Sequence, residues 1–232
     1  MKILAVDTSS AVAGCAVVDR EKLVCEHILN NKLTHSQTLM PMIDAVLRES
    51  ELAAADIDIF AAVTGPGSFT GLRIGVSAVK ALAHACNKPC VGVSTLDALA
   101  YNLPFSDALV VPVMDARRAE VYTAAYDTKN GLPEQLLPPC AVPLSELCDI
   151  VKGYGRRAVF LGDAIFVHRD FIAETMGAQA AFAPASLNAQ HAASAAVLAA
   201  GKPQIGYADL SPVYLRKSQA EREYENRNGG KK

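Results

Sequence analysis

The chain has 232 residues, of which 51% are hydrophobic and 20% charged. This composition is that of a globular protein with enough chain for one large domain or two lobes, and a net charge of −2 excludes a surface field that would gather nucleic acid unaided. No apolar run reaches the ~18 residues of a membrane span, so we expect a cytoplasmic protein without a membrane partner.

The first half of the sequence predicts elements in the order β-β-β-α-β-α-β-α. Short apolar runs bounded by turn residues indicate the strands, and apolar residues at helical spacing indicate the helices. The predicted strands are residues 3–6, 11–18, 23–29, 59–64 and 89–93, and the predicted helices are residues 36–50, a central helix whose first turn contains Gly71, and residues 95–101.

The second half predicts the same order again. Its strands are residues 108–115, 121–126, 135–142, 158–161 and 179–182, and its helices are residues 145–152, 166–176 and 188–200. Internal duplication is a signal at the level of the whole fold. We therefore predict an α/β protein of two duplicated lobes, residues 1–103 and 104–203, with a charged C-terminal extension, residues 204–232, that frays at its end.

The turn after the fourth strand, TGPGSFTG, invites comparison with phosphate-binding loops. A Walker A loop needs a lysine and a Ser or Thr after its last glycine, where this chain has Leu72 and Arg73. The dinucleotide fingerprint needs G-x-G-x-x-G, and here Gly71 comes one residue late. The pattern therefore favours a tight turn and close helix packing, with Ser68 or Thr70 capping the central helix.

Two helices of the first half carry more apolar surface than one sheet covers. Their apolar arcs span roughly 160° for residues 36–50 and roughly 220° for the central helix, where ~100° suffices. Either the helices cover only each other and the sheet, or the surplus binds another protein. Small residues on this surface would allow a close four-helix contact. The candidate interface consists of Leu39, Met40, Met42, Gly71, Ile74, Gly75, Ala78, Ala81 and Leu82.

Six cysteines lie mostly within apolar stretches. Their spacings fit no zinc knuckle and no redox pair, so we expect buried free thiols. They are Cys15, Cys25, Cys86, Cys90, Cys140 and Cys148.

Four motifs carry a resemblance to a known family. ILAVDTSS, LTHSQTLMPMI, VTGPGSFTGLRIGVSAVKALA and MDARRAEVY are similar to the bacterial TsaB (YeaZ) family of tRNA threonylcarbamoyladenosine biosynthesis proteins, and the similarity spans essentially the whole chain. The duplicated order and the opening IxxVDTSS resemble the superfamily of actin-like, sugar-kinase and Hsp70 ATPases. The resemblance therefore implies two actin-like ATPase, or ribonuclease H-like, lobes.

The same resemblance implies partners. It predicts a subunit that forms a heterodimer with the catalytic protein TsaD and works with the ATPase TsaE. Together they transfer a threonylcarbamoyl group from its adenylate to the adenosine adjacent to the tRNA anticodon. We expect tRNA to be reached through the complex, ATP and Mg²⁺ to be used by the partner proteins rather than by this chain, and a second copy of the chain to form a homodimer through the TsaD surface.

The sequence departs from the catalytic relative at its metal site. TsaD carries two metal-binding histidines at positions i and i+4 of a helix, and the corresponding residues here are Thr95 and Leu99. A leucine cannot bind a metal, and the five histidines offer no closely spaced pair to replace the missing one. We therefore predict no metal site, no catalytic residue and a non-catalytic subunit.

The nucleotide side departs as well. Catalytically active members of the superfamily have a glycine-containing turn after the first strand of each lobe, where backbone N–H groups bind the phosphates. Here Asp7, Thr8 and Ser9 are the candidate nucleotide-binding residues, and no glycine accompanies them. The adenosine-side double glycine is reduced to Gly162.

Two alternatives to the non-catalytic subunit stay open. The first is an active ATPase or kinase that uses Asp7, and the second is a glycoprotease-like peptidase. Arg117 and Arg118, in the second-lobe turn, either grip phosphate or pair with Asp115 and Glu120, and the pairing is favoured.

Overall fold

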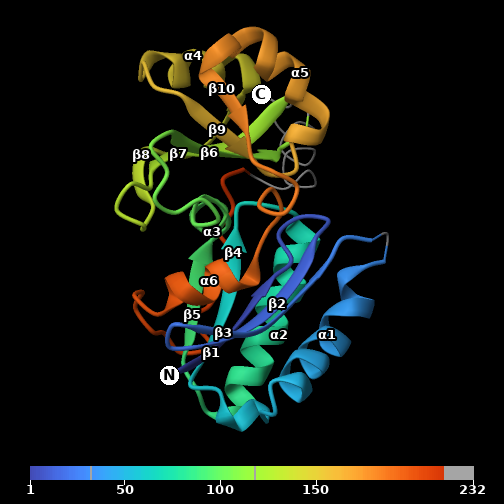
Figure 1. Cartoon of the computed structure of the whole chain (residues 1–232). Helices are drawn as coiled ribbons and strands as arrows, with labels where there is room; N and C mark the ends of the chain where they lie inside the picture. Colours follow the sequence, from blue (N-terminus) through green and yellow to red (C-terminus); the bar gives the residue numbers. More distant parts are fainter. Residues whose placement is uncertain (32, 118, 217–232) are drawn as a thin grey trace, which may run out of the picture.

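The computed structural model describes residues 1–31, 33–117 and 119–216, and Figure 1 shows two α/β lobes, one above the other. The first lobe contains a five-stranded sheet in the order β3-β2-β1-β4-β5. Its first three strands pair antiparallel, whereas β1, β4 and β5 run parallel. The strands are β1 (Lys2–Asp7), β2 (Ala13–Asp19), β3 (Lys22–Leu29), β4 (Ile59–Gly65) and β5 (Cys90–Ser94).

The second sheet repeats this topology. Its order is β10-β9-β6-β7-β8, in which β6, β7 and β8 pair antiparallel, β9 runs parallel to β6, and β10 runs parallel to β9. The predicted duplication and the α/β fold class are confirmed. The strands are β6 (Leu109–Asp115), β7 (Glu120–Asp127), β8 (Glu134–Pro143), β9 (Ala158–Leu161) and β10 (Ala180–Phe182).

Six α-helices connect these strands within the described residues. They are α1 (His35–Glu49), α2 (Phe69–Cys86), α3 (Thr95–Ala100), α4 (Leu144–Gly153), α5 (Ile165–Met176) and α6 (Ala192–Ala199), with short 3₁₀ turns at Ala54–Asp56 and Gly177–Gln179. Most bounds lie within a few residues of the prediction. The exception is α6, which begins at residue 192 rather than 188. Residues 188–191 stay outside the helix because carbonyl groups there bond other segments: Asn188 O accepts from Gly162 N, and Ala189 O accepts from the Asn102 side chain.

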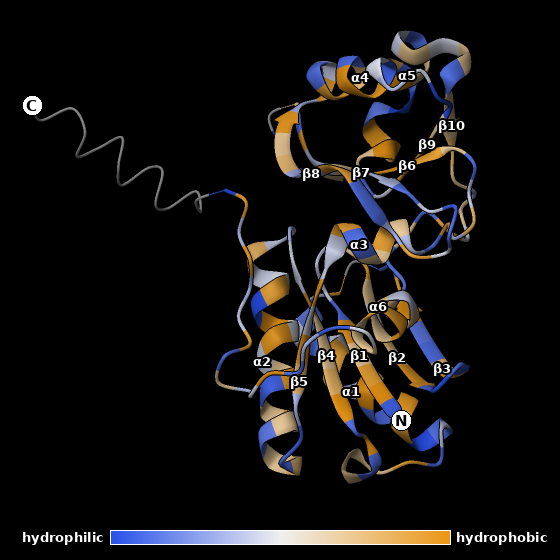
Figure 2. Ribbon diagram, turned by 90° about the vertical axis from the view of Figure 1, so that its left-hand side faces the viewer, coloured by the Kyte–Doolittle hydropathy of each residue, from blue (hydrophilic) through white to orange (hydrophobic). Residues whose placement is uncertain are grey.

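The last helix of each half contacts the sheet of the other half. Leu96 and Leu99 of α3 join the core of the second lobe. In the other direction, α6 packs on β1 and β2, where Ala195 and Ala196 contact the face of the first sheet that carries Ile3. Its alanines allow a close approach to the strands, and Figure 2 shows α6 against them with hydrophobic colouring. The lobe predicted as residues 104–203 therefore gives its last helix to the first sheet.

The opposite face of the first sheet carries α1 and α2. Leu4 and Val6 of β1 point toward these helices, since successive residues of a strand face opposite sides. The two halves thus interlock through α3 and α6, while α1 and α2 remain on the outside of the first lobe (Figure 1). Within the part of the chain that the structure describes, no helix has the length and apolar character needed to cross a membrane.

One ion pair fastens α6 to the edge of the first sheet. Glu26 of β3 accepts a hydrogen bond from Ala193 N at 2.9 Å, and its other oxygen lies 3.1 Å from His191 Nδ1. His191 Nε2 lies 2.9 Å from Ser186 O. Both ring nitrogens therefore face acceptors, and the hydrogen bond to Glu26 raises the pKa of His191 despite the opposing effect of burial.

This pair should make the stability of the fold depend on pH. A histidine whose pKa is raised in the folded state contributes stability that is complete below the unfolded value of about 6.5 and is lost as the pH rises through the folded value. Glu26→Gln should therefore lower the free energy of unfolding by about 1 kcal/mol more at pH 6 than at pH 8.5 in urea titrations. Glu21→Gln, at an exposed residue, is the control. An equal effect of Glu26→Gln at both pH values would contradict the assignment.

Candidate functional site

A cleft of about 810 Å³ separates the two lobes. From the first lobe, the β1–β2 turn and the start of α2 line it, and from the second lobe, the end of β6. Its lining is residues 9–11, 67–70 and 114–117 with His35, Arg73, Tyr122 and Asp163. The cleft lies between the lobes, where the resemblance to actin-like ATPases predicts a nucleotide, and the side chains around it decide what it can hold.

Asp7 is buried behind the cleft rather than exposed in it. Its Oδ1 accepts hydrogen bonds from Ser9 N at 2.8 Å and Ser9 Oγ at 2.6 Å, while Oδ2 has no hydrogen-bond partner among the described residues. Burial raises the pKa of this carboxyl, against the lowering effects of Ser9 and of His35. Of the three candidate residues Asp7, Thr8 and Ser9, Ser9 alone reaches the lining of the cleft.

The glycine-rich turn fills the space beside the first strand's end. A Cβ added to Gly67 would lie 2.2 Å from Ser9 O, and one added to Gly71 would lie 2.1 Å from Thr8 O. Hydrogen bonds close the gap further, from Ser68 N to Ser9 O at 2.7 Å and from Thr8 Oγ1 to Gly71 O at 2.7 Å. The turn after β1 is therefore occupied by the chain itself, as the prediction of close helix packing required. Ser68 caps α2, since its Oγ accepts from Gly71 N at 3.2 Å.

The second-lobe turn presents a cation to the cleft. Arg117 is exposed and its backbone N–H donates to Asp115 Oδ1 at 2.7 Å, but its guanidinium forms no ion pair with another described residue. Glu120, the other expected partner, pairs with Arg216 instead. The expected pairing is therefore wrong for Arg117, because Arg216 pairs with the Glu120 carboxylate. Arg118 lies outside the described residues.

Asp163 forms the second-lobe floor of the cleft. It follows Gly162, and its Oδ1 accepts from Asp115 N at 3.0 Å. Burial raises the pKa of its carboxyl, against the hydrogen bonds that it accepts. Carboxyls with raised pKa values, of buried Asp7 and half-buried Asp163, thus lie at the strand ends of both lobes.

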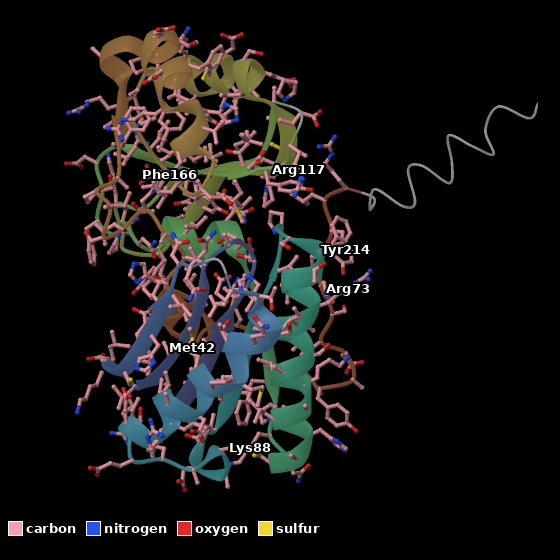
Figure 3. The ribbon with its side chains drawn as sticks, turned by 90° about the vertical axis from the view of Figure 1, so that its right-hand side faces the viewer. Met42, Arg73, Lys88, Arg117, Phe166 and Tyr214 are labelled. Carbon is pink, nitrogen blue, oxygen red and sulfur yellow. The ribbon has the colours of Figure 1, made fainter. Side chains whose placement is uncertain are left out.

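A C-terminal segment straps the cleft rim. Val213 N donates to Thr64 O at 2.8 Å, and Tyr214 stacks on Phe69 with ring centroids 4.4 Å apart. Arg73 Nε donates to the Tyr214 hydroxyl at 3.0 Å, and Figure 3 shows both residues below Arg117 along one side of the molecule. Arg216 then reaches the second lobe. Part of the predicted extension is thus built into the fold, whereas its predicted fraying end, residues 217–232, lies outside the described residues.

A second hollow, about 590 Å³ in volume, lies between α1 and α2 on the outer face of the first lobe. We call it the α1–α2 groove. Met40, which is 51% exposed, stands at its edge, and half-buried Ile74 and Ala78 line it together with exposed Ser77 and Arg73. This groove brings together part of the predicted interface.

Other members of that predicted interface point inward. Leu39 and Met42 are buried in the first-lobe core, and Gly71 and Gly75 are buried against the β1–β2 turn, where a Cβ on Gly75 would lie 2.3 Å from Thr8 Oγ1. The prediction that these four residues form a surface is therefore wrong, because all four are buried in packing contacts. Leu39 also lines the groove. The glycines of α2 thus pack against the β1–β2 turn of the same chain. Ala81 is exposed and Leu82 half-buried.

The positions of the missing histidine pair are closed to solvent. Thr95 and Leu99 are both fully buried on α3, and Leu99 packs in the second-lobe core. A side chain at either position faces packed protein rather than the cleft.

Comparisons with known proteins place the chain in a family. A family model described as "TsaD: tRNA N6-adenosine threonylcarbamoyltransferase" matches residues 23–224. The tRNA threonylcarbamoyladenosine biosynthesis protein TsaB of Bacillus subtilis is 35% identical over 221 residues, which cover 95% of this chain and 96% of that protein. The chain belongs to the TsaB family.

Solved structures agree with membership of the TsaB family. YeaZ from Pseudomonas aeruginosa matches with a TM-score of 0.78 and 29% identity over 92% of this chain and 99% of that one. The ROK hexokinase from Thermus thermophilus matches with a TM-score of 0.50 and 12% identity, over 86% of this chain and 99% of that one, which shows the fold alone. The predicted TsaB (YeaZ) resemblance and the actin-like ATPase type of fold are confirmed.

Proposed function

We propose that this member of the TsaB family is a cytoplasmic, non-catalytic subunit in tRNA threonylcarbamoyladenosine biosynthesis. The occupied turn after β1 carries the proposal. A phosphate turn needs free backbone N–H groups that point at the ligand. Here Ser9 N donates to Asp7 Oδ1 and Val12 N donates to Ser10 Oγ, and the turn lies against Gly67 and Gly71 without room for a methyl group. Asp7 is turned into the protein, where it is poorly placed to hold a hydrated Mg²⁺.

The proposed partner is TsaD, with TsaE joining the pair and tRNA reached through the assembly. The match of a TsaD family model to residues 23–224 supports a partner that shares the fold of this chain. Homologous lobes can pair through equivalent faces in a pseudo-twofold contact. The transfer of the threonylcarbamoyl group, and the use of ATP and Mg²⁺, then belong to the partners.

The proposed docking surface is the α1–α2 groove. It combines an exposed methionine with half-buried Ile74 and Ala78, and Ser77 and Arg73 form a polar rim beside them. An apolar centre with a polar rim is the usual anatomy of a protein interface. A second copy of the chain carries the same face, so we propose a homodimer that TsaD displaces.

The ATPase alternative draws on the cleft. It is large enough for a small-molecule ligand and is lined by hydroxyls and by exposed Arg117. Its weakness is the burial of Asp7. A peptidase needs an activated nucleophile, whereas burial raises the pKa of the thiols of Cys15, Cys25, Cys90, Cys140 and Cys148.

A reconstitution separates these functions. The purified chain, supplied with threonylcarbamoyl-adenylate and unmodified tRNA, should give no product above background, and addition of TsaD and TsaE should give product. Asp7→Asn should leave the reconstituted rate within about twofold, because the hydrogen bonds that the carboxylate accepts from described residues come from Ser9 in its own turn. Product without TsaD would overturn the non-catalytic role. Turnover of ATP by the chain alone that is lost in Asp7→Asn would establish the ATPase instead.

A further inference from the structure

Three metal-ligating side chains meet on the outside of the first lobe, away from the cleft. Cys25 and His27 lie two residues apart on β3, so both point to the same face of the strand. Glu49, in the last turn of α1, reaches them from above that face. Its Oε2 lies 2.8 Å from His27 Nε2 and 3.7 Å from Cys25 Sγ.

The three ligand atoms lie within 4.8 Å of one another. In a tetrahedral site with bonds of about 2.0–2.3 Å, ligand atoms are separated by roughly 3.3–3.8 Å. Small side-chain rotations, mainly of the exposed Glu49, are enough to bring the atoms to that spacing. Because Cys25 and His27 are each half-buried, the strand already fixes two of the three ligands.

We propose that Cys25, His27 and Glu49 bind a transition-metal ion of the Zn²⁺ class, with a fourth position open to solvent. A thiolate and an imidazole select zinc or a similar metal over Ca²⁺ and Mg²⁺, which prefer oxygen ligands. On binding, the metal displaces the Cys25 thiol proton to solvent. The sequence prediction of no metal site rested on paired histidines, and this cluster uses one histidine with a thiol and a carboxylate.

Two simpler explanations account for less of the geometry. A surface ion pair explains the contact between His27 and Glu49 but not the thiol directed at the same oxygen. A cysteine nucleophile would need its imidazole base beside the sulfur, whereas here the carboxylate contacts both groups. Burial, with Glu49 nearby, also raises the pKa of the Cys25 thiol, which opposes activation.

A metal here would join the edge strand β3 to the C-terminal end of α1. The same helix supplies Met40 to the α1–α2 groove, about two and a half turns toward its N-terminus from Glu49. The site is nevertheless independent of the proposed partner, since all its ligands belong to this chain and none lines the groove.

The test uses the full chain freed of metal with a chelator. Titration with CoCl₂, a spectroscopic substitute for Zn²⁺, should show one tetrahedral site with thiolate-to-metal charge-transfer absorption, and ZnCl₂ should displace the cobalt. Cys25→Ser should abolish the charge-transfer band. Glu49→Gln and His27→Gln should each weaken Zn²⁺ binding at least about tenfold in competition with a chromophoric chelator. Cys86→Ser, at another half-buried free cysteine, should match the wild type.

Two results would overturn the site. The first is a wild-type protein that binds Co²⁺ no more tightly than Cys25→Ser does. The second is a Zn²⁺ affinity that is unchanged in Glu49→Gln. Glu49 is exposed, so that variant should fold, and its affinity decides the question even if circular dichroism finds Cys25→Ser unfolded.

Discussion

Replacing Gly71 by alanine should lower the melting temperature by roughly 10 °C, because the added methyl group has no room. Its Cβ would lie 2.1 Å from the backbone oxygen of Thr8 and 3.3 Å from both His35 and Ser68. A backbone atom cannot move aside as a side chain can, so α2 must shift away from the β1–β2 turn. Overpacking of this kind costs about 3 kcal/mol, and the shift also weakens the bond from Thr8 Oγ1 to Gly71 O.

Gly153→Ala is the matched control. An added Cβ there meets nothing within 4 Å, and the residue ends a helix. Its melting temperature should stay within about 3 °C of the wild type, measured by differential scanning calorimetry. If Gly71→Ala melts together with the control, the turn after β1 is not closed by the glycine-rich segment, and the main argument against phosphate binding loses its support.

The strands and the duplication were predictable because they rest on local signals. Short apolar runs and turn residues indicate each strand, and the same order of elements in both halves predicts two sheets of one topology, which the structure confirms. The sheet on which each last helix packs was not predictable. Helical periodicity identifies an apolar face but not the sheet that it covers, and α6, with the sequence AASAAVLA, is apolar on every side.

The same limit explains the errors at the predicted interface. The projection of α2 gave one side of large residues and one of small ones, and the small side was expected to meet a partner helix. In the structure, the adjacent Gly71 and Gly75 receive the β1–β2 turn, so only the arc of Ile74, Ala78 and Ala81 remains toward the outside. A helical projection of α2 shows which residues are small, but it does not show that a turn elsewhere in the chain packs against them.

Side-chain contacts between segments far apart in the sequence could not be predicted. The segment that carries Tyr214 and Arg216 forms neither helix nor strand and lacks a periodic pattern, so nothing in it predicts stacking on Phe69 or pairing with Glu120. The Cys25 cluster depends on a carboxylate 24 residues further along the chain. Such pairs become visible only when the path of the backbone is known.

Substituting Ala78 by glutamate should weaken the binding of TsaD by about 100-fold or more, because the new carboxylate is placed in the apolar centre of the proposed docking surface. Ala78 is half-buried and lies in the α1–α2 groove beside Ile74 and Ser77. The free chain should remain folded, since the longer side chain can direct its charge to solvent along the groove. Titration calorimetry with TsaD measures the loss, and circular dichroism checks the fold.

Val197→Glu supplies the control, because it adds the same charge at an exposed apolar position of α6, on the opposite face of the first sheet. It should bind TsaD like the wild type. Sedimentation of the free Ala78→Glu chain then distinguishes the two proposed uses of the groove, since a shared surface requires the homodimer to weaken as well. If folded Ala78→Glu binds TsaD with undiminished affinity but no longer self-associates, the groove serves a second copy of the chain alone, and the TsaD surface must be sought elsewhere on the molecule.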